Sequence, residues 1–250
     1  MIMEKVLKAA EPYLVNKTVK DLVIGLSLIG CQLDSGHVGV SYVMREEIPR
    51  GCSNFPFAKE AIGKPALEIA RWVISGENSL QRAIASAVLA AASYEQNLPD
   101  DNVQGKLFGV DFKAGDTVGM IGLIGPVVKE LSAKVKEVII FDKGAEDPRL
   151  SPMEKQPELL PTCDVVIITG TTTINGTIDS LLTMCSRARE IVMVGPSTPM
   201  YPQGWQSSRL TVLAGSWWDC EHKDEIFKII SLAGGIRQLQ PYMQKKAVAV

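Results

Sequence analysis

The second half of the chain alternates continuous apolar runs with amphipathic segments, and this rhythm restricts the fold more than any other feature of the sequence. The runs expected to form strands are 117–121, 137–141, 165–169, 191–194 and 211–214. The segments expected to form helices are 126–136, 178–188, 203–208 and 221–232. Strands that are apolar throughout are buried on both faces, and helices between them cover a parallel sheet. The pattern predicts a Rossmann-like parallel-sheet domain.

The first half follows a different order. Alternating apolar residues at 22–28 and 38–44 flank the turn-rich Asp34-Ser35-Gly36, which predicts an antiparallel hairpin. Two helices are expected after it, one opened by Pro65 and one capped by Asn78. A hairpin followed by helices predicts an α+β domain.

The polar, turn-rich stretch Tyr94–Gly115 separates the two rhythms. Such stretches connect domains more often than they cross a core. The sequence therefore predicts one domain at 1–97 and a second at 98–250.

Composition and charge argue against several classes of protein. The 250 residues carry a net charge of −2, whereas nucleic-acid binders usually present a basic face. No apolar window reaches the ~18 residues of a membrane span, and the N-terminus does not resemble a signal peptide. We expect a cytoplasmic protein with no nucleic-acid or membrane partner. The sequence leaves open whether the protein forms a homo-oligomer.

The cysteines do not suggest a disulfide framework or a zinc ribbon. They are Cys31, Cys52, Cys163, Cys185 and Cys220. The number is odd, the spacings are wide and no CxxC pair occurs.

Polar and glycine-bearing turns follow the predicted parallel strands, at 122–126, 169–177, 195–199 and 215–219, and Asp142 follows the second strand. Open α/β sheets bind ligands beyond the carboxyl ends of their strands. This clustering predicts a site for a small-molecule substrate or ligand.

The first turn, in VGMIGLIGP, resembles half of a dinucleotide fingerprint. Gly122 and Gly125 are present, but Ile124 and Val127 occupy the positions of the other two glycines. Asp142 lies twenty residues beyond Gly122, where a ribose-binding carboxylate would be. The pattern argues against NAD(P) and leaves an adenosine-type ligand such as S-adenosylmethionine possible. The alternative is that the glycines only form the turn and the carboxylate caps a loop.

The next two turns supply the remaining candidate ligand-binding residues. They are Gly170, Thr171, Thr172, Asn175 and Thr177 in TGTTTINGT, and Gly195, Ser197 and Thr198 in GPSTP. Hydroxyls and backbone N–H groups before a helix suit a phosphate or carboxylate. The alternative is that these residues only cap the following helix.

Two histidines complete the candidates. His37, at the tip of the predicted hairpin, would become a catalytic acid or base if the first domain leaned over the sheet edge. Cys220 and His222 are weak metal candidates, because residues two apart on a helix do not face each other.

Several motifs together resemble a known prokaryotic family. They are VxxxGLIGP, VVIITGTTTINGTID, VGPSTPMYP, TVLAGSWWD and a final LAGG. In these motifs the chain resembles the putative heavy-metal chelation domain, also called domain of unknown function 364. GHVGVSYVMRE and LQRAIASAVLAAAS resemble its usual enolase N-terminal-like partner domain. Members often carry an Asn-Ala pair where this chain has Ala90-Ala91, which weakens a role for that helix.

The resemblance implies an enolase N-terminal-like domain, a Rossmann-like domain with partial similarity to methyltransferases, and a site between them. The roles suggested for the family are condensation or hydrolysis in making pterin-, flavin- or siderophore-like chelators. Three functions follow as hypotheses: a small-molecule enzyme, a heavy-metal binding or delivery protein using Cys220, His222, Cys52 or His37, and a non-catalytic ligand-sensing module.

Overall fold

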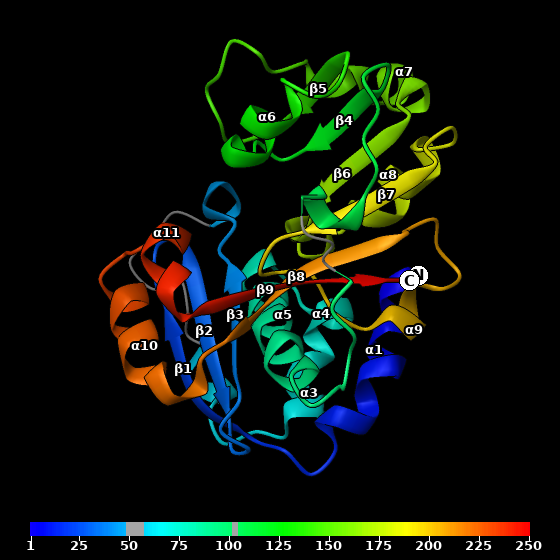
Figure 1. The fold of residues 1–250 in the computed structure, drawn as a ribbon. Coiled ribbons are helices and arrows are strands. Elements are labelled where there is room, and N and C mark those ends of the chain that lie inside the picture. The colour runs from blue at the N-terminus through cyan, green and yellow to red at the C-terminus, as the bar shows by residue number, and fades with distance from the viewer. Residues whose placement is uncertain (49–57, 102–104) are drawn as a thin grey trace.

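The computed structural model describes residues 1–48, 58–101 and 105–250, which form two sheets with helices packed around them (Figure 1). The first half has a three-stranded antiparallel sheet and one long helix against it. Its elements are α1 (Ile2–Leu14), β1 (Val19–Ile24), β2 (Leu28–Leu33), β3 (Val38–Tyr42), the 3-10 turn η1 (Arg45–Glu47), α2 (Ala58–Ala61), α3 (Ala66–Ala70), α4 (Trp72–Ser75) and α5 (Ser79–Ser93). The predicted α+β class of this half is confirmed.

The predicted hairpin is present, but the strand expected at 22–28 is two strands. β2 and β3 pair antiparallel around Gly36, whose φ of +88° suits a glycine. β1 ends before Gly25 and β2 begins at Leu28, so Leu26 lies in the turn with 65% of its surface exposed. A Cβ at Gly25 would lie 2.2 Å from the carbonyl oxygen of Ile230, so helix α10 (Lys223–Ser231) packs against this turn.

Helix α5 begins at the predicted cap. The Asn78 side chain accepts a hydrogen bond from the Gln81 backbone N–H at 3.0 Å. The Gln81 side chain reaches back to the Glu77 N–H at 2.7 Å, one residue earlier than in a standard capping box. The alanine-rich helix that follows packs closely against β2 and β3.

The second half contains the predicted parallel sheet. Its elements are η2 (Leu107–Gly109), β4 (Thr117–Ile121), α6 (Gly125–Leu131), β5 (Glu137–Phe141), η3 (Met153–Lys155), α7 (Gln156–Leu159), η4 (Leu160–Thr162), β6 (Val165–Thr169), η5 (Gly170–Thr173), α8 (Ile178–Met184), β7 (Glu190–Val194), α9 (Pro202–Trp205), β8 (Val212–Trp218), η6 (Cys220–His222), α10 (Lys223–Ser231), α11 (Ile236–Leu239), η7 (Gln240–Tyr242) and β9 (Met243–Ala249). Strands β4 to β8 are parallel, which confirms the Rossmann-like class.

The strand order is β5-β4-β6-β7-β8-β9. Its first five strands follow the flavodoxin-like order 2-1-3-4-5. Strand β9, which pairs antiparallel with β8, was not predicted, and neither was the extension of β8 to Trp218. MQKKAVA carries two lysines and is half exposed at the sheet edge, so it lacks the apolar pattern of a central strand.

Alternate strand residues face opposite sides of the parallel sheet. Val118 and Met120 of β4 pack with Val128 of α6 in one core cluster. Ile121 packs in another, with Leu181 of α8 and residues of α1 and α5. One face of the parallel sheet is therefore covered by α6, and the other by α8 together with helices of the first half of the chain.

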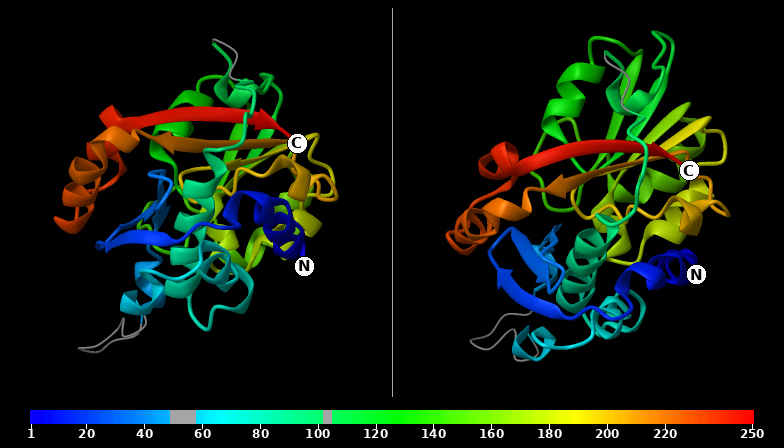
Figure 2. Two further views of the ribbon diagram at one scale, coloured as in Figure 1. Left: turned by 90° about the horizontal axis from the view of Figure 1, so that it is seen from below. Right: turned by 60° about the horizontal axis from the view of Figure 1, so that its bottom comes forward.

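The last helices return to the small sheet. Phe227 and Ile230 of α10 pack on β2, where a Cβ at Gly30 would lie 2.9 Å from the Phe227 ring. Figure 2 shows β8 and β9 running out of the parallel sheet toward α10. The core thus crosses the boundary between 1–97 and 98–250, and the division into two domains stays a prediction. Every helix in the described ranges is too short or too polar to cross a membrane.

Candidate functional site

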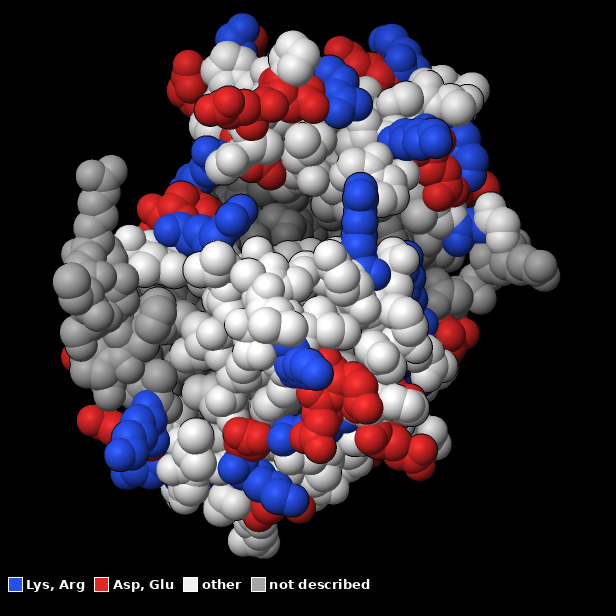
Figure 3. Space-filling model, turned by 90° about the vertical axis from the view of Figure 1, so that its left-hand side faces the viewer, with Lys and Arg blue, Asp and Glu red and all other residues white. Residues whose placement is uncertain are grey.

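A cavity of about 800 Å³ lies at the carboxyl ends of β4, β5 and β6. Most of its wall comes from four segments, within 42–46, 121–124, 141–145 and 169–177. Figure 3 shows the molecule hollowed between its two lobes, with side chains of both charges at the rim. The end of β3 and η1 belong to the first half of the chain, so both halves form the cavity.

The chain reverses its course across the sheet at this cavity. From β4 it runs to β5 on one side, then returns to β6 on the other side of β4. Loops that leave in opposite directions open a crevice, which is where open α/β sheets bind ligands. Small-molecule pockets typically measure about 300–1,000 Å³, and this cavity lies in that range.

Six of the predicted ligand-binding residues line the cavity. They are Gly122, Asp142, Thr171, Thr172, Asn175 and Thr177. The other five are not among the residues that line it: Gly125, Gly170, Gly195, Ser197 and Thr198. The structure therefore brings together the first two predicted loops and Asp142, and places the GPSTP loop elsewhere.

Asp142 holds two loops of the cavity together. Its Oδ2 accepts a hydrogen bond from the Leu123 N–H at 2.7 Å, and its Oδ1 accepts from Gly144 and Ala145 at 2.8 and 2.9 Å. A carboxylate oxygen accepts about two hydrogen bonds, so among the described residues Oδ1 is saturated and Oδ2 keeps one free position. The loop-capping role weighed for this residue is observed, and one acceptor position is left for a ligand.

Asp142→Asn is expected to lower the free energy of unfolding by about 1–3 kcal/mol. An amide has one oxygen, so either the Leu123 N–H or the pair at Gly144 and Ala145 would face an NH₂ group. Urea unfolding measures the change. Asp224→Asn, at an exposed side chain, is the control and should leave the midpoint unchanged. Equal midpoints for the two variants would contradict the bridging role of Asp142.

The backbone at position 122 explains why VGMIGLIGP has a glycine there. Its φ is +94°, which a residue with a Cβ adopts only with strain, and a Cβ would also lie 3.0 Å from the Thr169 side chain. The turn lets β4 and β6 approach each other at the base of the cavity. This supports the structural reading of Gly122.

The TGTTTINGT loop folds on itself through its own polar groups. Thr172 and Thr173 donate their hydroxyl protons to the carbonyl oxygens of Thr169 and Gly170, both at 2.8 Å. The Asn175 Oδ1 accepts from the Thr177 hydroxyl at 2.7 Å and from its N–H at 3.2 Å. The loop is thereby held in one shape along the cavity wall.

The GPSTP loop joins the two halves of the chain. Ser197 is 2% exposed, and its Oγ accepts from the Tyr42 N–H at 2.9 Å and lies 3.0 Å from the Ser41 Oγ. The loop also covers Gly170, where a Cβ would be 2.6 Å from the Thr198 nitrogen. These contacts connect β3, β6 and β7, so Ser197 and Gly170 have structural roles.

Ser197→Ala is expected to destabilise the protein by about 1–3 kcal/mol, because it leaves the buried Tyr42 N–H without an acceptor. Thr198→Val is a matched comparison. The Thr198 hydroxyl is buried and has no hydrogen-bond partner among the described residues, so its removal should be neutral or stabilising. Thermal unfolding of both variants tests this, and a larger loss in Thr198→Val would contradict the assignment.

Four charged residues that line the cavity were not predicted from the sequence. They are Arg45, Glu46, Lys143 and Glu154. The residues at 42–46 follow directly on β3, in SYVMRE, but the sequence does not show that this strand end meets the parallel sheet. Tyr42 also lines the cavity, and burial raises the pKa of its phenol.

His37 lies at the other end of β3 from the cavity. Its ring stacks on Tyr94 with centroids 4.7 Å apart, and its Nδ1 is 3.4 Å from a Glu95 oxygen. The expected approach of the hairpin tip to the site does not occur, because the opposite end of the strand faces the sheet edge.

Cys220 and His222 are each engaged with a neighbour. The Cys220 thiol donates to the Trp218 carbonyl at 3.4 Å, and His222 Nδ1 lies 2.7 Å from Asp219 Oδ2. Within the described ranges, no group of three or more His, Cys, Asp or Glu is arranged to hold a metal ion. Cys52, also considered as a ligand, lies outside the described residues.

Comparisons with known proteins agree with this architecture. Residues 106–249 match the DUF364 family and residues 7–93 match DUF4213, both described as "Putative heavy-metal chelation". A DUF364 protein of unknown function from Pyrococcus horikoshii has a similar structure, with a TM-score of 0.82, 21% identity and 100% of both chains covered. One from Desulfitobacterium hafniense has a TM-score of 0.77, 20% identity and 99% of both covered. No curated protein matches the chain.

Proposed function

Because the chain belongs to the DUF364 family, described as "Putative heavy-metal chelation", we propose that it is an enzyme acting on a small molecule bound between its two halves. The observation that carries the proposal is the cavity of about 800 Å³ at the sheet's switch point, walled by both halves. In this proposal, "chelation" refers to making a chelator, by condensation or hydrolysis, and not to holding a metal.

The state of the thiols supports this reading of the family description. Thiolates, not thiols, bind metal ions. Burial raises the pKa of Cys163 to about 11 and that of Cys185 to about 12, and raises the pKa of Cys31 further. Burial therefore disfavours the thiolate form that a metal ion needs at these three positions.

Thermal unfolding in the presence of candidate ligands tests the binding step. S-adenosylmethionine, nucleotides, pterins and flavins form the first panel. A ligand at one hundred times its Kd adds about 2.7 kcal/mol of stability, which for a chain of this length raises the Tm by roughly 5–10 °C. If no compound in the panel shifts the Tm, the proposal loses its support. Incubation with the stabilising compound then separates an enzyme, which converts it, from a ligand sensor, which does not.

Direct metal binding is the second candidate function, because the family is described as "Putative heavy-metal chelation". Elemental analysis of untagged protein decides it, with Cys220→Ser as the variant. Stoichiometric metal that is lost in this variant would favour metal binding or delivery over the enzyme.

A further inference from the structure

We infer that the molecule bound in this cavity is uncharged or cationic and presents N–H or O–H donors to the TGTTTINGT wall. The inference rests on the proposed function, since it takes the cavity to be the ligand site. It narrows the class of substrate to amino-substituted rings and polyols, and it excludes phosphates and carboxylates as the anchoring group.

Three of the hydroxyls along this wall donate their protons within the protein. Thr172 donates to the Thr169 carbonyl at 2.8 Å, Thr177 to the Asn175 side-chain oxygen at 2.7 Å, and Ser180 to the Thr177 carbonyl at 2.8 Å. All three residues line the cavity. A hydroxyl whose single proton is used can only accept from a ligand. These three hydroxyls can therefore accept hydrogen bonds from donor groups on a ligand.

Three backbone N–H groups of this wall also donate within the protein. In the TGTTTINGT loop, Ile174 and Asn175 donate to the Thr171 carbonyl at 2.9 and 3.1 Å, and Thr177 donates to the Thr172 carbonyl at 3.1 Å. A phosphate site at a loop needs several free N–H groups converging on one point. This loop has turned these N–H groups inward, which removes them from any anion.

The loops after β4 and β5, on the opposite side of the cavity, also use backbone N–H groups within the protein. Gly122 donates to the Phe141 carbonyl at 2.7 Å, and Leu123, Gly144 and Ala145 donate to Asp142. The remaining position on Asp142 Oδ2 is a further acceptor. Asp142 and the threonine wall thus present acceptor oxygens to the cavity, while these four N–H groups are used within the protein.

One donor on this wall is fixed. The Asn175 oxygen accepts from the Thr177 backbone N–H, which can only donate, so the orientation of the amide is determined. Its NH₂ group, which carries two N–H donors, therefore points away from Thr177 and can donate to an acceptor on the ligand. A ligand edge with several donors and one acceptor matches this pattern.

The charged residues of the lining also argue against an anionic ligand. Among the described residues, two cations, Arg45 and Lys143, meet three carboxylates, Glu46, Asp142 and Glu154. Apolar side chains of Ile121, Leu123 and Phe141 complete the wall. An anion gains no net attraction from such a lining, whereas a ring with polar edges can use both its apolar and its acceptor parts.

A fragment screen by crystal soaking or protein-observed NMR tests the class. Three matched sets are needed: amino-heterocycles and polyols, their N- or O-methylated counterparts, and inorganic phosphate, pyrophosphate and small carboxylates. We expect the donor-bearing set to occupy the cavity with at least tenfold higher affinity than the methylated set, and the anions to stay out. Anions in the cavity, or methylated fragments that bind equally well, would overturn the inference and leave the proposed function standing. No fragment of any set in the cavity would overturn both.

Two matched threonines provide the mutational test. Thr177→Val removes an acceptor from the wall, whereas Thr162→Val removes a hydroxyl that donates to the Leu159 carbonyl outside the cavity. Thr177→Val should weaken the donor-bearing fragments three- to tenfold, and Thr162→Val should not. If Thr177→Val does not fold, Ser180→Ala removes an acceptor from an exposed position. Unchanged affinity in the folded cavity variant would contradict the inference.

Discussion

Gly39→Ala is expected to lower the free energy of unfolding by about 3 kcal/mol or more, the largest loss for a single added methyl group in the small sheet. A Cβ at Gly39 would lie 2.1 Å from the Ala87 carbonyl oxygen and 2.3 Å from the Ala91 nitrogen. Both atoms belong to the backbone of α5, so no side-chain rotation relieves the clash, and β3 must separate from the helix. Urea unfolding and soluble yield measure the loss.

Gly125→Ala is the control for this prediction. No atom lies within 4 Å of a Cβ at Gly125, the first residue of α6, so alanine should be tolerated. If Gly39→Ala unfolds at the same urea concentration as Gly125→Ala, the close packing of β3 on α5 is wrong. Because β3 leads into residues 42–46, the cavity would then also need a different wall.

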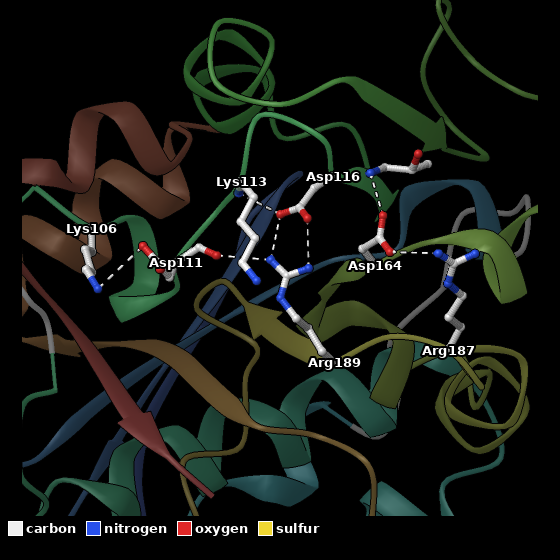
Figure 4. Close-up of polar contacts among 8 residues, drawn as sticks. Lys106, Asp111, Lys113, Asp116, Asp164, Arg187 and Arg189 are labelled. Carbon is white, nitrogen blue, oxygen red and sulfur yellow. Dashed lines mark hydrogen bonds and ion pairs between the residues drawn. The ribbon is translucent and has the colours of Figure 1, made fainter.

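Asp116→Asn is expected to cost about 2 kcal/mol, the next largest effect. The Asp116 side chain is 6% exposed and binds Arg189 through both oxygens, at 2.8 and 2.6 Å, while also accepting from the Lys113 N–H at 2.7 Å. Figure 4 shows this pair at the amino ends of the strands, beside Asp164 and Arg187. Asparagine cannot accept both guanidinium bonds and removes the carboxylate that is hydrogen-bonded to Arg189.

Asp147→Asn is the matched control, because Asp147 and Arg149 form the same two-bond pair on the surface. The Arg149 side chain is 56% exposed. Exposed pairs contribute little, so the loss should be well below that of Asp116→Asn. Equal losses in both variants would contradict the distinction between the two pairs.

The Asp116 effect should depend on pH in a defined direction. The Arg189 hydrogen bonds hold the pKa of Asp116 below its usual value. A carboxyl with a lowered pKa stabilises the folded state fully above its unfolded pKa of about 4 and loses that contribution as the pH falls through the folded value. The difference between wild type and Asp116→Asn should therefore be largest at neutral pH and shrink below about pH 4. A difference that grows in acid would contradict this account.

The alternation of apolar strands and helices was sufficient to predict the parallel sheet, because central strands buried on both faces leave a strong pattern. The pattern failed where burial is one-sided or interrupted. β9 is a half-exposed edge strand with lysines, and the turn at Leu26 carries an apolar residue in register with both neighbouring strands. The packing of α10 on the small sheet depends on contacts between residues two hundred positions apart, such as Gly30 and Ile230, which no local pattern records.

The candidate site was predicted in part for the same reason. Strand-end loops can be located from sequence, and six of the chosen residues do line the cavity. Whether a polar side chain faces a ligand or the protein depends on its partners in three dimensions. Ser197 faces β3, and the threonine loop uses its own N–H groups and protons. The phosphate or carboxylate expected from the loop composition is thus replaced by a proposed donor-bearing ligand.

The most direct test of the central claim is a crystal structure of the protein with a compound that raises its Tm. We expect density for this compound in the cavity, between Tyr42 of the first half and Asp142 and Asn175 of the second. Density for the compound at another place on the molecule, with this cavity empty, would contradict it.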